Sequence, residues 1–313
     1  MSGTSQTAPD DHGRGGSRGD GPDPATEAFL AHRSLLFTVA YEMLGSAADA
    51  EDVLQETWLR WAYVDLATVR DQRAYLVRIT TRQALSRLRT LGRRNESYVG
   101  PWLPEPLLTA PDVAEDVELA DSVSMAMLLV LETLAPAERA VFVLREVFDV
   151  GYDEIADAVD KSPAAVRQIA HRARAHVAAR RPRGGVSTAE TRDAVDAFRR
   201  AAETGDLQSL LDILAPDVVY LADGGGVKRS VPRPVVGADK VGRLLSAGLG
   251  RIAATASLQL APVNGYPALI LRFNGEIDTV LALRIDDGLV SGLYAVRNPE
   301  KLLRMQRETA LRR

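Results

Sequence analysis

Two arginine-rich stretches are the residues of this sequence best suited to chemistry on a charged partner. Residues 70–94 contain eight arginines and one acid, Asp71, a net charge of +7 (8 − 1). Residues 161–183 contain one lysine, six arginines and no acid, again +7 (1 + 6). Clustered cations bind phosphates, and an aromatic residue beside them can stack on a base. Both stretches predict nucleic-acid binding, although the whole 313-residue chain has a net charge of −4.

The first stretch fits the surface of one long helix. An apolar stripe at helical spacing faces inward between about Gln72 and Arg89, and it consists of Ala74, Val77, Ala84, Leu85 and Leu88. Several arginines therefore project together with Tyr75. An ordinary arginine-rich surface helix is the alternative. We disfavour it because the sequence supplies almost no counter-charges here, and an unpaired cluster of like charges repels itself.

The second stretch follows a helix-turn-helix pattern. Residues 152–159 predict a short helix, and a longer one runs from Pro163 to about Ala179, with Ser162 as N-cap and Pro163 at its first position. The second helix of this motif enters the major groove of DNA. The candidate contacts on it are Ser162, Ala164, Arg167, Gln168, His171, Arg172 and Arg174. Arg167 and Gln168 are long enough for base edges, and Arg172 and Arg174 suit phosphates. A purely structural helical hairpin is the alternative.

An acidic helix precedes the first arginine stretch. Ser46 and Asp49 have the spacing of a capping box, which predicts that a helix begins after Ser46. An apolar stripe at helical spacing continues to Trp61. The polar residues off this stripe are Glu51, Asp52, Gln55 and Glu56. Taken alone, such a pattern is typical of a solvated helix face near the positive end of the helix dipole.

These elements belong to a chain that composition divides into five segments. We expect a disordered tail at 1–23, a helical domain at 24–95, a proline-rich linker at 96–122, a second helical domain at 123–183 and an α+β domain at 187–305. A hinge is expected at Pro182-Arg-Gly-Gly185. In the last segment, helices at 191–203 and 207–214 precede strands at 218–221, 258–263, 268–273, 277–285 and 289–296. The predicted fold is therefore multidomain: two all-α domains, then an α+β domain.

Composition excludes several classes of site. The chain has no cysteine, so disulfides, thiolate metal sites and thiol nucleophiles are absent. No apolar run reaches the length of a membrane span, and the Gly-, Ser- and Asp-rich first residues differ from a secretory signal. His171 and His176 are five positions apart, which misses the spacing of a helical metal site. We expect a cytoplasmic protein with no membrane contact, no metal and no cofactor.

The two basic helical blocks resemble one known family. Asp49-Ala-Glu-Asp-Val-Leu-Gln-Glu-Thr-Trp-Leu-Arg-Trp61 resembles the second-region helix of extracytoplasmic-function sigma factors. Residues 73–89 resemble the adjoining promoter-melting region, and residues 134–174 resemble the fourth region. The resemblance covers about 24–181 and implies an alternative RNA polymerase sigma factor, which starts transcription at promoters.

The resemblance implies roles for residues already named. The clamp helices of the β′ subunit of core RNA polymerase would be bound by Asp49, Glu51, Asp52, Gln55 and Glu56. The −10 element would be contacted by Arg73, Tyr75, Arg78 and Arg82, where a base is flipped out as the duplex opens. The fourth-region helix would read the −35 element. Core polymerase and promoter DNA are thus the implied partners.

The remainder resembles the subgroup that carries a C-terminal SnoaL-like domain, a cone of curved sheet closed by helices. The resemblance rests on Trp102-Leu-Pro-Glu-Pro106, on Asp223-Gly-Gly-Gly226 with Lys228, and on Asn298-Pro-Glu-Lys301. Val227 stands between the glycines and Lys228, which departs from the pattern. We expect the glycine loop to dock on the linker and regulate activity in cis. The residues expected there are Trp102, Pro104, Asp223, Gly224, Gly225, Gly226, Asn298, Pro299 and Lys301.

Two other functions remain open. A ligand-responsive, one-component DNA-binding regulator would use the same helix-turn-helix, but it has no use for the acidic face at 49–56. An isomerase or cyclase would use the SnoaL-like cone. Residues 184–313 contain no His, Cys or Trp, so catalysis would depend on Asp217, Asp223, Asp278 or Tyr220. We expect no enzyme, and a small ligand in the cone stays an open alternative.

Overall fold

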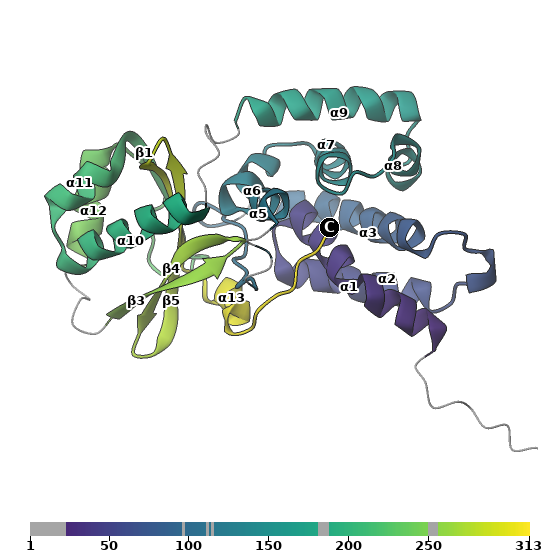
Figure 1. The fold of residues 1–313 in the computed structure, drawn as a ribbon, viewed down its shortest axis with the longest axis horizontal. Helices are drawn as coiled ribbons and strands as arrows, with labels where there is room; N and C mark the ends of the chain where they lie inside the picture. The colour runs from purple at the N-terminus through teal and green to yellow at the C-terminus, as the bar shows by residue number, and fades with distance from the viewer. Residues whose placement is uncertain (1–22, 96–97, 111–112, 114–115, 181–187, 250–255) are drawn as a thin grey trace, which may run out of the picture.

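The computed structural model describes residues 23–95, 98–110, 113, 116–180, 188–249 and 256–313. Two helical bundles lie side by side, and a domain built around a sheet adjoins them (Figure 1). This confirms the predicted fold class of two all-α domains followed by an α+β domain. The expected disordered tail, apart from Asp23, and the expected hinge at 182–185 lie outside the described residues.

The first helical bundle is built around α1 (Pro24–Leu44), whose second half, Leu35–Leu44, is buried. It consists of α1, α2 (Ala47–Trp61), a 3₁₀ turn η1 (Leu66–Thr68) and α3 (Gln72–Asn95). The Trp61 side chain is fully buried, and its Nε1 donates to the Ala25 carbonyl at 2.7 Å. Ser46 caps α2 as predicted, because its Oγ accepts from the Asp49 backbone N–H at 3.2 Å.

The second helical bundle contains the helix-turn-helix. It consists of α5 (Val117–Val123), α6 (Met125–Leu131), α7 (Pro136–Phe142), a π turn η2 (Val143–Val147), α8 (Tyr152–Val159) and α9 (Pro163–Ala178). The bounds of α8 are those predicted. The π turn η2 directly follows α7. Asp160 ends α8 with a φ of +57°, and this left-handed residue turns the chain into α9.

The two bundles share one apolar core. Buried residues from α1, α2, α3, α7, α8 and α9 form a continuous cluster, and α7 and α8 lie against α3 (Figure 1). Glu42 of α1 is buried at this junction, where Ser122 Oγ contacts its Oε1 at 2.8 Å. Burial raises the pKa of Glu42 to about 8. The hydrogen bond from Ser122 and the charge of Arg139 oppose this effect.

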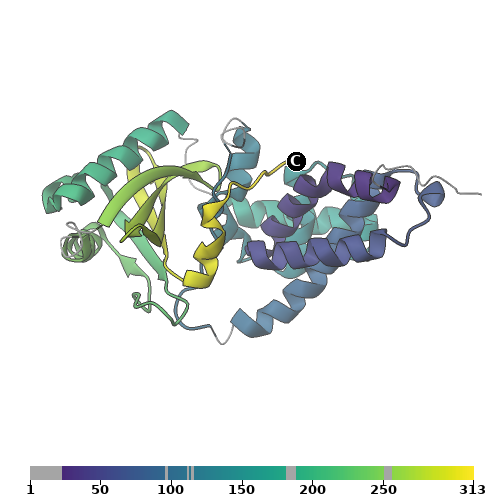
Figure 2. The same cartoon turned by 90° about the horizontal axis from the view of Figure 1, so that it is seen from below.

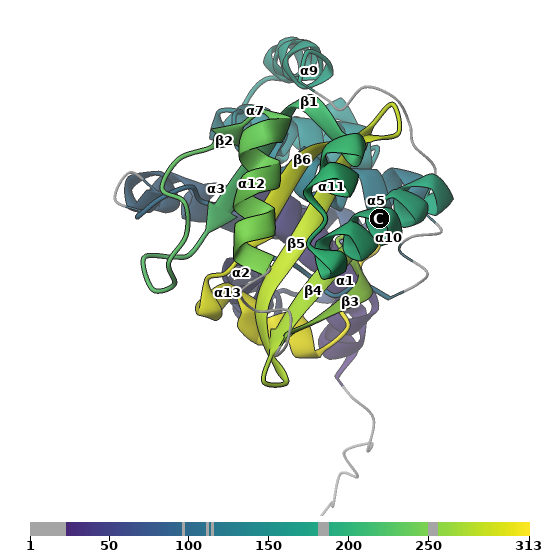
Figure 3. The ribbon, with the colours of Figure 1, turned by 90° about the vertical axis from the view of Figure 1, so that its left-hand side faces the viewer.

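The C-terminal domain is one curved sheet with helices on one face. Its elements are α10 (Thr188–Thr204), α11 (Leu207–Ile213), β1 (Leu214–Asp223), β2 (Val235–Val236), α12 (Ala238–Leu249), β3 (Ala256–Val263), β4 (Tyr266–Phe273), β5 (Glu276–Asp286), β6 (Leu289–Val296), α13 (Pro299–Leu302) and η3 (Leu303–Gln306). The strand order is β2-β1-β6-β5-β4-β3; β1 and β6 pair in parallel, and the other neighbouring strands of this sheet pair antiparallel. Figure 3 shows α10, α11 and α12 on the near face. The sequence prediction missed α12 and β2.

Alternate residues of the strands serve two different interfaces. Leu269, Leu283 and Leu293 face the helices α10–α12. Their neighbours on the opposite face, such as Ile270 and Tyr294, belong to a separate cluster that includes Leu103 of the linker and Met125 of α6. Because strand side chains alternate between faces, one set of strands both closes the C-terminal domain and joins it to the rest of the chain.

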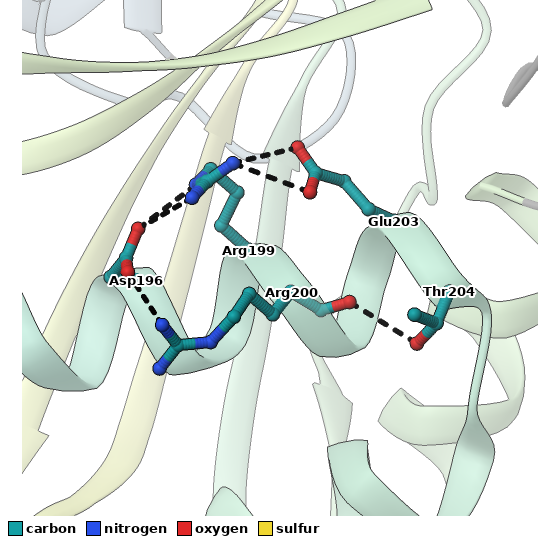
Figure 4. A network of polar contacts seen from close by, with 5 residues as sticks. All are labelled: Asp196, Arg199, Arg200, Glu203 and Thr204. Carbon is teal, nitrogen blue, oxygen red and sulfur yellow. Dashed lines mark hydrogen bonds and ion pairs between the residues drawn. The ribbon is translucent and has the colours of Figure 1, made fainter.

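The charged side chains of α10 form ion pairs with one another. Arg199 bridges Asp196 and Glu203, and Arg200 also donates to Asp196 (Figure 4). The hydrogen bond from Arg199 holds the pKa of Asp196 below its ordinary value. These pairs are solvent-exposed, and such pairs are screened by water and salt. The network therefore belongs to a solvated helix surface.

The turn between β3 and β4 joins the C-terminal domain to both bundles. Asn264 and Gly265 have φ angles of +52° and +77°, as in a two-residue type I′ hairpin. The buried Asn264 Nδ2 donates to Tyr41 Oη of α1 at 2.6 Å and to the Val123 carbonyl of α5 at 2.9 Å. Its Oδ1 accepts from the Leu107 N–H of the linker at 3.0 Å. One side chain thus contacts three segments.

The C-terminal segment returns to the helical bundles. Beyond η3 it runs from the sheet toward α1 (Figure 2). Thr309 N–H donates to the Leu108 carbonyl at 2.8 Å, and Arg312 N–H donates to Thr38 Oγ1 at 3.0 Å. Leu311 is buried in the shared helical core. The linker is therefore held between the β3–β4 turn and the last residues.

Two glycine substitutions separate backbone strain from domain docking. Gly265 and Gly275 both follow an asparagine in a hairpin turn, with φ of +77° and +84°. A Cβ on Gly265 would lie 2.7 Å from Cα and Cβ of Ala120 in α5, whereas nothing lies within 4 Å of one on Gly275. We expect Gly275→Ala to cost only left-handed strain, about 1–2 kcal/mol. Gly265→Ala adds overpacking of about 1–3 kcal/mol. Urea unfolding followed by circular dichroism should give the lower midpoint for Gly265→Ala, and equal midpoints would contradict the docked turn.

Candidate functional site

Helix α9 presents its predicted basic face to solvent. The seven candidate residues are all exposed: Ser162, Ala164, Arg167, Gln168, His171, Arg172 and Arg174. The apolar stripe on the other side, including Val166 and Ala173, is buried. Ser162 Oγ accepts from the Ala165 N–H at 3.2 Å, so the hydroxyl is occupied by capping. Helix α9 runs along the outer edge of the molecule (Figure 1), where a duplex could approach it.

The cations of α9 are not equivalent. Arg174 Nε lies 3.4 Å from Glu146 Oε1, and its Nη2 donates to Tyr152 Oη at 3.4 Å. The Arg167 guanidinium lies 6.0 Å from the Tyr152 ring centre. Arg172 has no ion pair or side-chain hydrogen bond within the described residues. It is therefore the cation of this face most available to a phosphate.

The basic face of α3 is partly covered by the second bundle. Arg73 is exposed. Arg78 lies over the ring of half-buried Tyr75, 4.6 Å from its centre, and that ring also packs against Trp61 at 5.8 Å. Arg82 Nη2 donates to the Asp157 carbonyl of α8 at 2.6 Å. The candidates Tyr75 and Arg78 thus lie together, whereas Arg82 is engaged by the helix-turn-helix.

The expectation of an unpaired arginine cluster is wrong for Arg87. Its Nε donates to Asp49 Oδ1 and its Nη2 to Asp52 Oδ2, each at 2.8 Å. These hydrogen bonds, above all that to Asp49, raise the pKa of Arg87. The cause is the packing of α3 beside α2, which brings together residues 35 and 38 positions apart. The Asp49 carboxylate faces Arg87, so only the Ser46 half of the expected capping box is formed within the described residues.

The acidic face of α2 is split between paired and free groups. Arg33 donates to both carboxylate oxygens of Glu51, at 2.9 and 2.7 Å. Asp49 is buried, while Asp52, Gln55 and Glu56 are exposed. Leu59 is also 61% exposed, and its spacing of four from Gln55 places it on the same side of the helix. Sequence reasoning missed Leu59, although its position off the apolar stripe was a usable signal.

The Asp223 carboxylate gathers the glycine loop, the linker and α13. It is fully buried. Its Oδ1 accepts from Tyr98 Oη at 2.7 Å and from the Gly225 N–H at 2.9 Å. Its Oδ2 accepts from the Leu103 N–H at 3.0 Å and from Lys301 Nζ at 2.7 Å. A buried carboxylate needs this many partners to offset its lost hydration.

Lys301 and Asn298 complete this network from α13. Lys301 Nζ also donates to the Leu103 carbonyl and lies 4.3 Å from the Trp102 ring centre. Burial lowers the pKa of Lys301, and the charge of Asp223 opposes that effect. Asn298 Nδ2 donates to Tyr98 Oη at 3.0 Å, while its Oδ1 caps α13 at Glu300 N–H. Pro299 is the first residue of that helix.

The glycine loop has room for hydrogen atoms only. Gly225 has a φ of +63°, and a Cβ there would overlap the Asn298 amide. A Cβ on Gly224 would meet the Lys228 carbonyl, and one on Gly226 would lie 3.3 Å from Val99 of the linker. Lys228 points elsewhere and pairs with Asp278 at 2.8 Å. Lys301, not Lys228, is the cation of the Asp223 network.

The linker is also fixed to the first bundle. The Trp102 ring packs against Gly45, where a Cβ would lie 2.7 Å from Cη2. Glu105 is buried, its N–H donates to the Gly45 carbonyl at 2.8 Å, and its Oε2 accepts from the Ala48 N–H at 3.1 Å. Burial raises the pKa of Glu105 despite these contacts. Pro104 is buried between them. Sequence reasoning missed Tyr98, Glu105 and Asn264 as contact residues.

The described part of the chain holds no group of three or more His, Cys, Asp or Glu side chains arranged for a metal ion. None of its helices combines the length and apolar character needed to cross a bilayer.

The chain is similar to known proteins over most of its length. Residues 28–94 match the family model of Sigma-70 region 2, and residues 124–177 match that of Sigma-70 region 4. The ECF RNA polymerase sigma factor SigJ of Mycobacterium tuberculosis is 36% identical over 289 residues, 87% of this chain and 91% of that protein. The probable ECF RNA polymerase sigma factor SigI of the same species is 34% identical over 283 residues, 90% of this chain and 95% of that protein.

A solved structure agrees with these relatives. The crystal structure of Mycobacterium tuberculosis extracytoplasmic function sigma factor SigJ aligns with a TM-score of 0.73 at 33% identity, covering 90% of this chain and 99% of that one. The likeness therefore includes the C-terminal sheet domain as well as both helical bundles. The chain belongs to the extracytoplasmic-function (ECF) RNA polymerase sigma factors.

Proposed function

We propose that this sigma factor binds core polymerase through α2, contacts the −10 element through α3 and reads the −35 element through α9. We further propose that its C-terminal domain regulates it in cis by holding the linker. The observation that carries the regulatory proposal is the buried Asp223 carboxylate, which binds Tyr98 and Leu103 of the linker. The cytoplasm is the proposed site of action, since RNA polymerase works there.

The spacing of promoter elements supports a closed, restrained state. The −35 and −10 elements are about 25 base pairs apart, on the order of 85 Å of duplex at 3.4 Å per step. Packed helices lie about 8–10 Å apart, and α8 packs between α3 and α9. The two DNA-binding helices are thus on the order of 20 Å apart. This arrangement cannot contact both elements, so the bundles must separate.

The linker is long enough to permit that separation once it is released. Residues 96–116 are 21 residues (116 − 95), which reach about 70 Å when fully extended. In the closed state Asp223 holds Leu103, Asn264 holds Leu107, and Thr309 holds Leu108. Undocking the C-terminal domain would free all three contacts together. Docking therefore inhibits, and undocking activates, promoter engagement.

The alternative functions have less support. A one-component regulator has no need of the exposed acids Asp52 and Glu56 on α2. Catalysis in the C-terminal domain would need a base. Burial disfavours ionised Asp278, but the hydrogen bond from Lys228 and the charge of Arg297 outweigh it and hold the pKa of Asp278 below its ordinary value. Such a carboxylate is a poor proton acceptor near pH 7. We propose a regulatory rather than a catalytic domain.

Charge reversal on α2 tests polymerase binding. We expect the Glu51→Lys, Asp52→Lys double variant to bind purified core polymerase at least tenfold more weakly, because both acids would face cationic groups of the partner. Asp212→Lys, at an exposed acid of α11, is the matched control and should bind normally. Biolayer interferometry measures both affinities. Unchanged affinity of the double variant would remove the proposed polymerase face.

Two substitutions on α9 test −35 recognition by holoenzyme. Gln168→Ala should reduce discrimination between the correct and an altered −35 base by about 1–3 kcal/mol, because Gln168 is placed at the base edges. Arg172→Ala should weaken binding to all sequences alike and lower the salt dependence by about one phosphate contact. Filter binding across a salt series separates the two effects. If both variants changed affinity in the same sequence-independent way, α9 would not be reading bases.

A distance measurement tests control by the C-terminal domain. The chain lacks cysteine, so Ser86→Cys in α3 and Ala175→Cys in α9, both exposed, accept a dye pair. Asp223→Asn removes the charge that pairs with buried Lys301, a loss of about 3–5 kcal/mol for a buried pair. Single-molecule energy transfer should then show an extended population, and run-off transcription should rise at least threefold.

The control for this measurement lies in the same domain. Asp287→Asn alters a turn residue at φ +51°, a conformation that asparagine tolerates, and it should leave distance and transcription unchanged. If Asp223→Asn lengthened the distance but lowered transcription, docking would activate rather than inhibit. If neither quantity changed, control by linker docking would be wrong.

A further inference from the structure

The C-terminal domain encloses a large apolar cavity. Its volume is about 760 Å³, within the range of small-molecule sites. It lies between the helices α10 and α12 and the face of the sheet that they cover. The apolar side chains that line it include Phe198, Leu244, Leu258, Leu269, Leu271 and Leu281. Such a lining excludes a small, fully polar ligand and favours a molecule with a bulky hydrocarbon body.

Polar groups gather at one part of this lining. Arg297 Nη2 donates to Asp278 Oδ2 at 3.1 Å, and its Nη1 donates to the Arg229 carbonyl at 2.6 Å. Arg297 lines the cavity with its side chain 32% exposed, and each of its Nη atoms carries a second N–H beyond these two bonds. Tyr220 also lines the cavity, and its hydroxyl forms no hydrogen bond with the residues that the structure describes. Two donors are therefore available beside the apolar wall.

The charges of this polar group do not balance. Among the residues that line the cavity, two cations, Arg229 and Arg297, accompany one anion, Asp278, which gives +1 (2 − 1). Asp278 already accepts from Lys228 and Arg297. A ligand with a carboxylate would supply the missing negative charge and could accept from both the Arg297 and Tyr220 side chains. A cationic ligand would instead add to the excess positive charge.

We propose that this cavity binds an amphipathic carboxylate, with its hydrocarbon body among the leucines and its carboxylate at Arg297 and Tyr220. The site lies next to the contacts that hold the linker. Arg297 precedes Asn298 in the chain, and its N–H donates to the Asp223 carbonyl at 2.7 Å. Ligand and linker would thus be bound by opposite faces of β1 and β6, which extends the proposed regulation without depending on it.

Isothermal titration calorimetry of the full chain with dodecanoate tests the proposal, using dodecyltrimethylammonium as the matched cation and concentrations below micelle formation. We expect the unaltered chain to bind dodecanoate at least tenfold more tightly than the cation. Comparable affinities for the two would overturn the assigned head-group chemistry. This comparison needs no variant, so it does not depend on the folding of an altered chain.

Two variants locate the binding. Leu271→Trp places a larger side chain in the cavity and should abolish dodecanoate binding. Arg297→Gln removes the charge at the polar end and should weaken it at least tenfold, whereas Arg297→Lys should restore part of the affinity. Circular dichroism and thermal unfolding verify that each variant is folded. Dodecanoate binding that is unchanged in folded Leu271→Trp would place the site elsewhere and overturn the proposal.

Discussion

A fully buried carboxylate, Asp223, is the group around which the domains of this protein are arranged. A charge without access to water needs a counter-ion and several hydrogen-bond donors. These donors come from three places: Gly225 in its own loop, Tyr98 and Leu103 in the linker, and Lys301 in α13. No two of these segments suffice alone, so the carboxylate is satisfied only when loop, linker and α13 are together. The same requirement makes the docked state cooperative, because the loss of one partner leaves a buried charge uncompensated.

The β3–β4 turn secures the other end of the linker by a different chemistry. Asn264 uses a neutral amide and its own backbone to contact Tyr41, Val123 and Leu107. Gly265 brings the turn close to Ala120 of α5. These contacts and those of the returning C-terminal segment hold the linker from both sides. The sheet therefore lies between the helix-covered cavity and the linker. Because strand side chains alternate between its two faces, the cavity and the linker contact different side chains.

The closed arrangement also explains why the arginines of α3 differ in availability. Arg82 is held by the helix-turn-helix and Arg87 by the acids of α2, whereas Arg73 remains exposed. Part of the positive charge of α3 is thus engaged within the molecule. In contrast, the seven candidate residues of α9 are exposed.

The sequence alone determined the features that depend on neighbouring residues. The start of α2 at Ser46, the bounds of α8, the cap of α9 at Ser162 and strands β3 to β6 follow from capping groups, turn residues and apolar periodicity, all of which act within a few positions. The family resemblance was likewise visible in short motifs. The strand β2 was missed because it has only two residues. The helix α12 was also missed, although Val241, Leu244 and Leu245 have helical spacing and were a usable signal.

Only the tertiary structure decided which distant residues meet. Arg87 pairs with Asp49 and Asp52. Asp223 forms its ion pair with Lys301 rather than with Lys228, which is nearer in the sequence. Asn264 lies between three segments. Ion pairs and hydrogen bonds of this kind depend on distance and direction in space, which are set by how helices and strands pack. A charge count along the chain cannot supply that information, since it treats a paired and an available arginine alike.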